Sequence, residues 1–185
     1  MKDKHDMMTM ISLSEEFYGS VTDKKDLLEV YNFVKEILGP DIITFEQFVH
    51  MQEHNDEISH NIRRPNGELC GFLSLSFLTA SAFKQLENKS LRTMELSGEH
   101  QVLSNTVPAA IYVGAVGASE DRSARKSTME YFNYAMSYYE DKFPQAAVLM
   151  RPVTESGLRV AGRSGFIPFH EQSGLGHLYI KDCLS

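Results

Sequence analysis

Three cationic residues, Arg122, Arg125 and Lys126, stand between an apolar segment and a long helical pattern. The first turn of a helix leaves several backbone N–H groups without partners, and the helix dipole makes this end favourable for negative charge. Cationic side chains gain nothing from the dipole at this end, so their presence favours a bound anion such as a pyrophosphate. We therefore predict a small anionic ligand at this segment. The alternative is that the three charges only form a solvated helix face.

A second candidate for chemistry is the HMQEH sequence of residues 50–54, which matches the inverted zinc-protease pattern H-x-x-E-H. Residues four apart share one face of a helix, so His50 and His54 would be the zinc ligands and Glu53 the base. Three fixed positions arise easily in a chain with 7 histidines. We therefore expect an ordinary polar helix face and no metal site, and a zinc hydrolase stays the alternative.

The helices that must position these residues follow from apolar periodicity and from the residues that begin and end helices. Apolar residues at helical spacing predict an amphipathic helix that is capped by Thr22 and stopped by Gly39 and Pro40. Thr44 and Gln47 have capping-box spacing, which predicts a second helix. The further helices that we expect are residues 83–86, a long helix opened by a loop at residues 118–127, and residues 154–163.

The strands are predicted from short apolar or β-branched runs bounded by turn residues. Residues 108–117 show no polar alternation, which indicates a strand buried on both faces. The strands that we expect are residues 9–13, 59–64, 69–79, 91–96, 108–117, 146–150, 167–170 and 177–180. We interpret residues 1–185 as a single domain, with an insertion at about residues 80–106 over the substrate side.

Composition excludes several classes of protein. The 185 residues are 42% hydrophobic and 23% charged, with a formal net charge of −7. This acidity argues against nucleic-acid binding, and no apolar segment approaches the roughly 20 residues that span a bilayer. Two cysteines are too few for a disulfide framework or a four-thiolate metal site. We expect one compact cytoplasmic domain.

The order of the elements, together with three landmarks, resembles the GNAT superfamily of acyl-CoA N-acyltransferases, with this chain as a divergent member. The landmarks are the NGELCGF sequence of residues 66–72, the strand that ends in Val116 before a loop and a long helix, and residues 146–150 followed by a short helix that closes on residues 164–166. The resemblance implies an α/β fold of the α+β type, in which helices flank a mixed, mostly antiparallel sheet. It also implies acetyl-CoA or another acyl-CoA as co-substrate, and relatives that are often homodimers.

The resemblance places the acyl-CoA site at the strand end and the helix start. The residues that it implies are Val116, Gly117, Arg122, Ser123, Ala124, Arg125, Lys126 and Ser127. A backbone N–H near Val116 or Gly117 would meet the thioester carbonyl. The family pattern is Gln/Arg-x-x-Gly-x-Gly/Ala, which Arg122 matches, whereas Arg125 and Ser127 stand where small residues are expected. Glycine allows close backbone approach to phosphate, so this departure predicts a displaced loop or altered binding.

The acceptor side must deprotonate an amine, stabilise an oxyanion and release a thiolate. Many members place an acidic Tyr where this chain has Ala161. A thiol pKa of roughly 8.5 still makes the thiolate a tolerable leaving group. Arg151 would pair with a substrate carboxylate or cap its strand. The candidate catalytic side chains are Tyr112, Glu99 and His170, with Glu95 and His100 as further candidate bases.

These observations predict an enzyme that moves an acetyl or longer acyl group from acyl-CoA to an amine by direct attack. The acceptor would be a small molecule or a protein, with no nucleic acid and no membrane span involved. The alternative is a non-catalytic module of the same fold that senses acyl-CoA or binds a protein partner. The missing glycines and the missing Tyr motivate that alternative.

Overall fold

The structure is a computed structural model that describes residues 10–40 and 42–181. The strands are β1 (Ile11–Ser12), β2 (Tyr18–Val21), β3 (Ser59–Arg63), β4 (Leu69–Leu78), β5 (Ala110–Ala118), β6 (Ala147–Met150), β7 (Ile167–Pro168) and β8 (Tyr179–Lys181). The α-helices are α1 (Leu27–Leu38), α2 (Phe45–His54), α3 (Ala80–Glu87), α4 (Arg122–Lys142) and α5 (Glu155–Arg163). None of the helices in these two ranges is long and apolar enough to cross a membrane.

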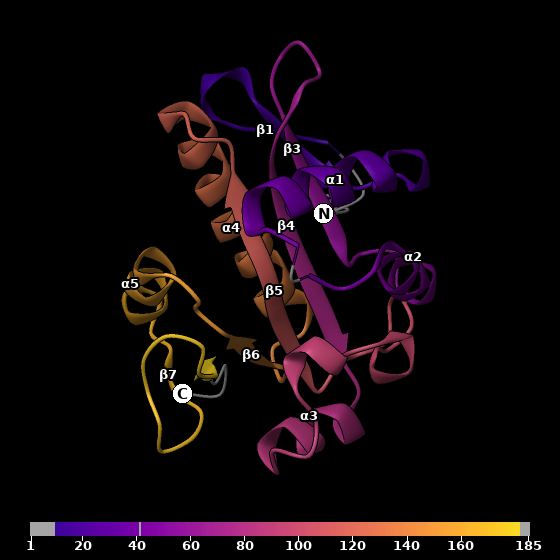
Figure 1. Ribbon diagram of the computed structural model, residues 1–185, viewed down its shortest axis with the longest axis vertical. Helices are drawn as coiled ribbons and strands as arrows, with labels where there is room; N and C mark the ends of the chain where they lie inside the picture. The colour runs from indigo at the N-terminus through magenta and orange to yellow at the C-terminus, as the bar shows by residue number, and fades with distance from the viewer. Residues whose placement is uncertain (1–9, 41, 182–185) are drawn as a thin grey trace, which may run out of the picture.

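The strands form one 8-stranded sheet in the order β1-β2-β3-β4-β5-β6-β8-β7 (Figure 1). β5 and β6 are parallel, and the other neighbouring strands are antiparallel. The expected mixed, mostly antiparallel sheet flanked by helices is therefore confirmed.

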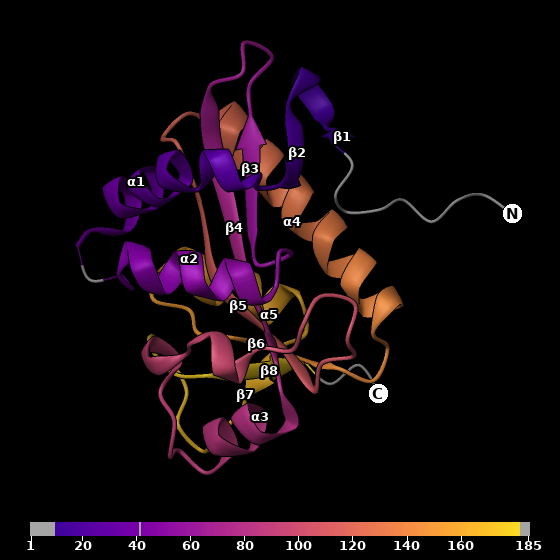
Figure 2. The ribbon, with the colours of Figure 1, turned by 90° about the vertical axis from the view of Figure 1, so that its right-hand side faces the viewer.

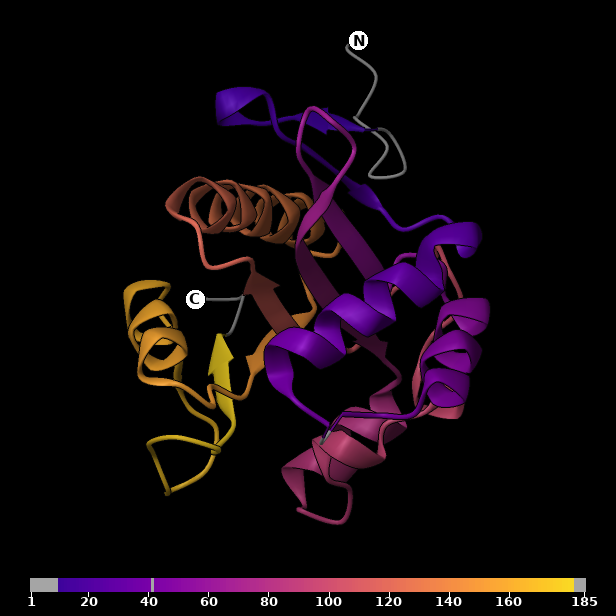
Figure 3. The ribbon, with the colours of Figure 1, turned by 45° about the horizontal axis from the view of Figure 1, so that its top comes forward.

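Helices cover both faces of the sheet. Figure 2 shows α1 and α2 on one face and α4 on the other, and Figure 3 shows the same separation from above. Tyr131 and Tyr139 of α4 are fully buried in the larger core, which also contains Ala161 of α5. On the opposite face, α1 and α2 pack on Phe72, while α3 packs in a cluster with Tyr112. The two faces of the sheet thus have separate apolar cores.

The predicted helix signals are confirmed where side chains cap the backbone. The Thr44 hydroxyl accepts a hydrogen bond from the Gln47 N–H at 3.2 Å, and the Gln47 side chain accepts one from the Thr44 N–H at 3.0 Å. Thr154 caps α5 by accepting from the Gly157 N–H at 3.1 Å. Gly39 ends α1 with a φ of +87°, a value that glycine adopts without strain.

Strand β2 was missed by the sequence analysis, which treated this segment as a polar break. β2 has only four residues, and two of them, Tyr18 and Ser20, are partly exposed. Its pairing with β3 and its contact with α4 are tertiary features. A Cβ on Gly19 would lie 2.1 Å from a ring carbon of Tyr131, so only glycine fits at this position.

Other boundaries also differ from the predictions. Residues 91–96 are not a strand, because Thr93–Glu95 form a 3-10 turn in which Arg92 and Glu95 pair side chain to side chain. α1 begins at Leu27 after a further 3-10 turn rather than at Thr22. β7 ends at Pro168, two residues earlier than predicted. α4 begins at Arg122, inside the predicted loop of residues 118–127, because Asp121 caps it.

Candidate functional site

The candidate site starts where β5 and β6 separate. Their last paired residues are Val113 and Met150, after which β6 ends and β5 continues to Ala118, paired only with β4. Figure 1 shows β6 turning away from β5 at this point. Gly114 is exposed and the four following residues are half-buried. The last five residues of β5 therefore have one edge without a neighbouring strand, which we call the free edge.

A bulge in the β4–β5 ladder sets the direction of the backbone groups along the free edge. The register shifts between Ser74 and Leu75, which leaves Gly114 as the extra residue of β5. Beyond the bulge, the Ser119 N–H donates to the Cys70 carbonyl on the β4 side. Alternate residues of an antiparallel strand share a direction, so Gly117 also points to β4. The Val116 N–H accordingly points to the free edge.

The free edge leads directly to the first turn of α4, where an internal carboxylate already lies. Asp121 accepts a hydrogen bond from the Ala124 N–H at 2.8 Å. Its other oxygen lies 2.5 Å from the Arg64 guanidinium. The Ala124 N–H and the Arg64 guanidinium hold the pKa of Asp121 below its ordinary value. A carboxylate at this helix start occupies the place that the sequence predicted for an external anion.

The predicted cofactor-binding residues of α4 divide between two faces of the helix. Ala124 and Ser127 are fully buried against the sheet, so their side chains face away from solvent. Arg122, Arg125 and Lys126 are exposed. The Arg125 guanidinium donates to the Glu120 carbonyl, which holds it beside the helix start. Ser123 is half-buried between the two sets.

Tyr112 and Arg151 lie on either side of the point where the strands separate. Tyr112 is the register partner of Leu149 on β6, and Arg151 follows the last residue of β6. The Tyr112 side chain is only 5% exposed. Burial raises the pKa of its hydroxyl, while interactions with Thr93 and Arg151 oppose that rise. Tyr112, Thr93 and Arg151 are therefore near enough to affect one another electrostatically.

The structure does not bring the other candidate bases to Tyr112. Glu99 is exposed and lies 3.5 Å from the Ser97 hydroxyl, and the His100 ring also contacts Ser97. His170 is half-buried against the Phe169 ring, with 4.8 Å between ring centroids. Glu95 is exposed and paired with Arg92. No hydrogen bond or ion pair within residues 10–40 and 42–181 links Glu99 or His170 to Tyr112.

The H-x-x-E-H sequence lies on α2, as predicted, but its side chains do not converge. His54 contacts the Gln101 carbonyl at 3.1 Å, whereas His50 and Glu53 are exposed. In the described part of the chain, no group of three or more His, Cys, Asp or Glu residues is placed to hold a metal ion. The zinc-hydrolase alternative therefore has no support in the geometry.

Residue 161, where the family that the sequence resembles often has a Tyr acting as the acid, is a buried alanine. Ala161 is fully buried in the larger core, and Gly165, at a φ of +81°, and Phe166 follow the end of α5 at Arg163. No hydroxyl is present at this position to protonate a thiolate. The hydroxyl of Tyr112 belongs to the residue next to Val113, the last residue of β5 that pairs with β6.

Sequence reasoning missed Asp121, Arg64 and Thr93. Asp121 stands three residues before Ala124, and this N-cap spacing could have predicted that Asp121 caps α4. Arg64 comes from the β3–β4 turn, 57 residues away from its partner. Thr93 meets Tyr112 only because a 3-10 turn replaces the predicted strand.

Comparisons with known proteins support the fold. No protein-family model and no curated protein match the sequence. Among solved structures, Arabidopsis thaliana NAA60 in complex with acetyl-CoA has a TM-score of 0.59 at 14% identity, covering 90% of this chain and 99% of that one. A mosquito arylalkylamine N-acetyltransferase like 5b has a TM-score of 0.58 at 8% identity, with the same coverage. A histone acetyltransferase HPA2 and related acetyltransferase from Corynebacterium glutamicum has a TM-score of 0.55 at 12% identity, covering 88% and 93%.

The chain therefore has the fold of the GNAT acetyltransferases. Identities of 8–14% leave the acceptor, the acyl donor and the activity to be argued from the residues of this chain.

Proposed function

We propose that the protein is an acyl-CoA-dependent N-acyltransferase, which moves an acetyl or longer acyl group to an amine. The observation that carries this proposal is the free edge of β5, which runs from the strand separation to the start of α4. An acyl-CoA bound along this edge would have its thioester near a backbone N–H donor and its phosphates near cationic side chains. Arg122 and Arg125 supply those charges.

The chemistry needs little from side chains. A neutral amine attacks the thioester carbon, the C–N bond forms, the C–S bond breaks and the thiolate leaves. The Val116 N–H, which points to the free edge, would stabilise the oxyanion that develops on the carbonyl. The amine proton passes to a base, for which Tyr112, Glu99 and His170 stay the candidates. The absent Tyr at Ala161 leaves the thiolate to depart without a dedicated acid.

The pyrophosphate end of the site fits less well. Asp121 already accepts the Ala124 N–H, and two anionic groups repel each other over one helix start. A pyrophosphate therefore binds there only if Asp121 turns away or if the phosphates lie farther along, beside Arg122 and Arg125. This observation also supports a second candidate, a non-catalytic module that uses the same edge to bind an acyl-CoA or a protein partner.

A thiol-release assay separates these two candidates. We expect acetyl-CoA, supplied with a panel of amines, to release free thiol together with acetylated amine. Arg122→Ala should raise the KM for acetyl-CoA, whereas Arg163→Ala, an exposed arginine at the end of α5, should leave it unchanged. Saturable binding of acetyl-CoA without transfer to any amine would favour the non-catalytic module. If neither CoA nor acetyl-CoA binds at millimolar concentration, the transferase and the acyl-CoA-binding module both fail, and only a protein-binding module remains.

A small-molecule or protein acceptor and a homodimer both stay predictions. A small-molecule amine and a protein amine both suit direct attack. A homodimer is tested by the mass of the protein in solution.

A further inference from the structure

Arg151 differs from the other arginines of the chain in its surroundings. Five arginines are exposed, and only Arg63, Arg64 and Arg151 are half-buried. Arg63 and Arg64 each hold a carboxylate at 2.5 Å. Arg151 makes no ion pair with any residue that the structure describes, and its Nε atom is buried without a hydrogen-bond partner. A buried Nε–H group without an acceptor costs free energy, which a bound anion would offset.

The direction of the Arg151 side chain follows from the alternation along β6. Met150 packs in the core beneath α4, whereas Leu149 packs in the cluster that contains Tyr112. Successive side chains of a strand point to opposite faces, so Arg151, which directly follows β6, would lie on the Leu149 face if the alternation continues by one residue. The interaction of Arg151 with the Tyr112 hydroxyl agrees with this direction. Arg151 therefore lies on the face opposite α4, beside the insertion of residues 80–106.

Two hydroxyl groups and an apolar cluster lie near Arg151. Thr93 and Tyr112 both have hydroxyls, which can donate to a carboxylate oxygen as the guanidinium does. The cluster that contains Tyr112 also contains the buried Leu91 and Leu96, and the half-buried rings of Phe83 and Phe169 pack against it with centroids 5.8 Å apart. Half-buried rings of this kind suit an apolar or aromatic substituent next to the charged group.

Arg151 and the proposed thioester position both lie just beyond the point where β5 and β6 separate. Met150 pairs with Val113, and Arg151 is the next residue after this last pair. Val116 lies three residues past Val113, which corresponds to roughly 10 Å of strand. A carboxylate held by Arg151 would leave an amine, one or two carbon atoms away, close to a carbonyl held at the Val116 N–H.

We propose that Arg151, with the Tyr112 and Thr93 hydroxyls beside it, binds the carboxylate of the acyl acceptor. The acceptor class is then an amino acid, with an apolar or aromatic side chain against the half-buried Phe83 and Phe169 rings. This inference rests on the proposed N-acyltransferase function and specifies its substrate. Arg151 acts as a specificity residue, whose bidentate hydrogen bonds distinguish an amino acid from the same amine without its carboxylate.

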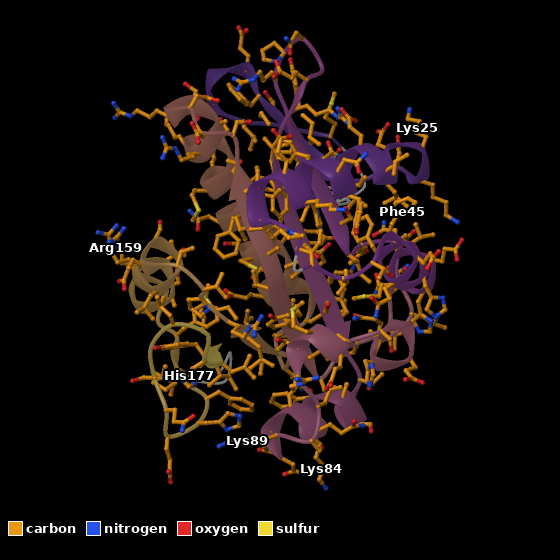
Figure 4. All side chains as sticks on the ribbon, viewed as in Figure 1. Lys25, Phe45, Lys84, Lys89, Arg159 and His177 are labelled. Carbon is orange, nitrogen blue, oxygen red and sulfur yellow. The ribbon has the colours of Figure 1, made fainter. Side chains whose placement is uncertain are left out.

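The first test measures binding without any acyl transfer. The full chain is titrated calorimetrically with the twenty common amino acids, with and without CoA, and the tightest ligand is compared with its decarboxylated amine and its carboxamide. We expect the amino acid to bind roughly tenfold tighter or more than the other two probes. Arg151→Gln should abolish that preference and Arg151→Lys should weaken it. Arg159→Gln should retain it, because Arg159 points outward from α5 (Figure 4).

Several results would contradict the role assigned to Arg151. Binding of no amino acid, equal affinity for the acid and the amine, or a preference that survives Arg151→Gln in a folded variant would each overturn the inference. If transfer from acetyl-CoA proceeds, Arg151→Gln should raise the KM for the amino acid and leave that for the simple amine unchanged. An effect of Arg151→Gln confined to succinyl-CoA would place the carboxylate on the donor and overturn the acceptor assignment. Failure of CoA binding would remove the proposed function, while the calorimetric comparison would still report on Arg151.

Discussion

The core determines both the hydrogen bonds and the protonation state of His60. Its Nε2 lies 2.9 Å from the Glu57 carbonyl, which can only accept, so Nε2 donates and Nδ1 accepts from the Tyr131 hydroxyl at 2.9 Å. His60 is fully buried, and this desolvation lowers its pKa to about 4. The neutral ring is therefore the form that the fold requires.

The stability of the protein should depend on pH through His60. The pKa of His60 is about 4 in the folded state and 6.5 in the unfolded state, so the unfolded state binds the extra proton as the pH falls from 6.5 to 4. We expect a loss on the order of 3 kcal/mol of unfolding free energy across this window. Urea unfolding at several pH values would measure it. In His60→Gln, which keeps a donor and an acceptor, the loss of unfolding free energy between pH 6.5 and 4 should be smaller by this amount. An unchanged loss would contradict the assignment.

The unpaired charge of Arg151 gives a prediction for the protein without ligand. Arg151→Met should leave the Tm unchanged or raise it, because no ion pair is lost and the buried Nε no longer lacks a partner. Arg63→Met should lower the Tm by about 2 °C, since it leaves Glu29 unpaired, although Glu29 is half exposed and screening keeps the loss small. Thermal unfolding of both variants tests this. A lower Tm for Arg151→Met than for Arg63→Met would assign Arg151 a structural role.

At the scale of elements, β2 depends on one glycine. Gly19→Ala places a Cβ within 2.1 Å of the Tyr131 ring, so it should lower the unfolding free energy by about 2 kcal/mol. Gly162→Ala is the matched control, because nothing lies within 4 Å of its Cβ and it belongs to α5. This control should raise the unfolding free energy by about 0.5 kcal/mol. Equal effects in urea unfolding would show that β2 does not pack on α4 in this way.

The start of α4 yields a prediction about anion binding. Asp121→Asn keeps a side-chain acceptor for the Ala124 N–H but removes the negative charge. We expect this variant to bind CoA more tightly than the wild type, with the difference shrinking at high salt. Glu120→Gln is the control, because it removes one negative charge from an exposed side chain that does not cap the helix. Weaker CoA binding by Asp121→Asn would mean that the carboxylate assists the ligand instead of competing with it.

Sequence patterns predicted some elements well because their signals are local. The capping box of Thr44, the cap of Thr154 and the stop at Gly39 all depend on neighbouring residues, and each lies where it was predicted. β2 and the 3-10 turn at Thr93–Glu95 were missed because tertiary contacts determine them. The proximity of Tyr112 and Arg151 could not be predicted from the sequence, because it depends on the register of β5 and β6.

At the scale of the whole molecule, one sheet organises both the fold and the candidate site. The parallel pairing of β5 and β6 ends while β5 continues, and this exposes a backbone edge between two helical layers. The proposed donor lies along that edge towards α4, and the proposed acceptor lies on the opposite face near Arg151. The architecture was predictable from the order of elements, whereas the competing Asp121 carboxylate required the three-dimensional structure.

The most direct test of the central claim is to locate acetyl-CoA on the backbone by two-dimensional amide NMR. We predict saturable chemical-shift changes concentrated at the free edge, on Val116 and its neighbours in β5, and at the first turn of α4. Amides of α3 and of β1 should change little, and they serve as the internal reference. Shift changes that avoid β5 and α4, or no change at millimolar acetyl-CoA, would contradict the account.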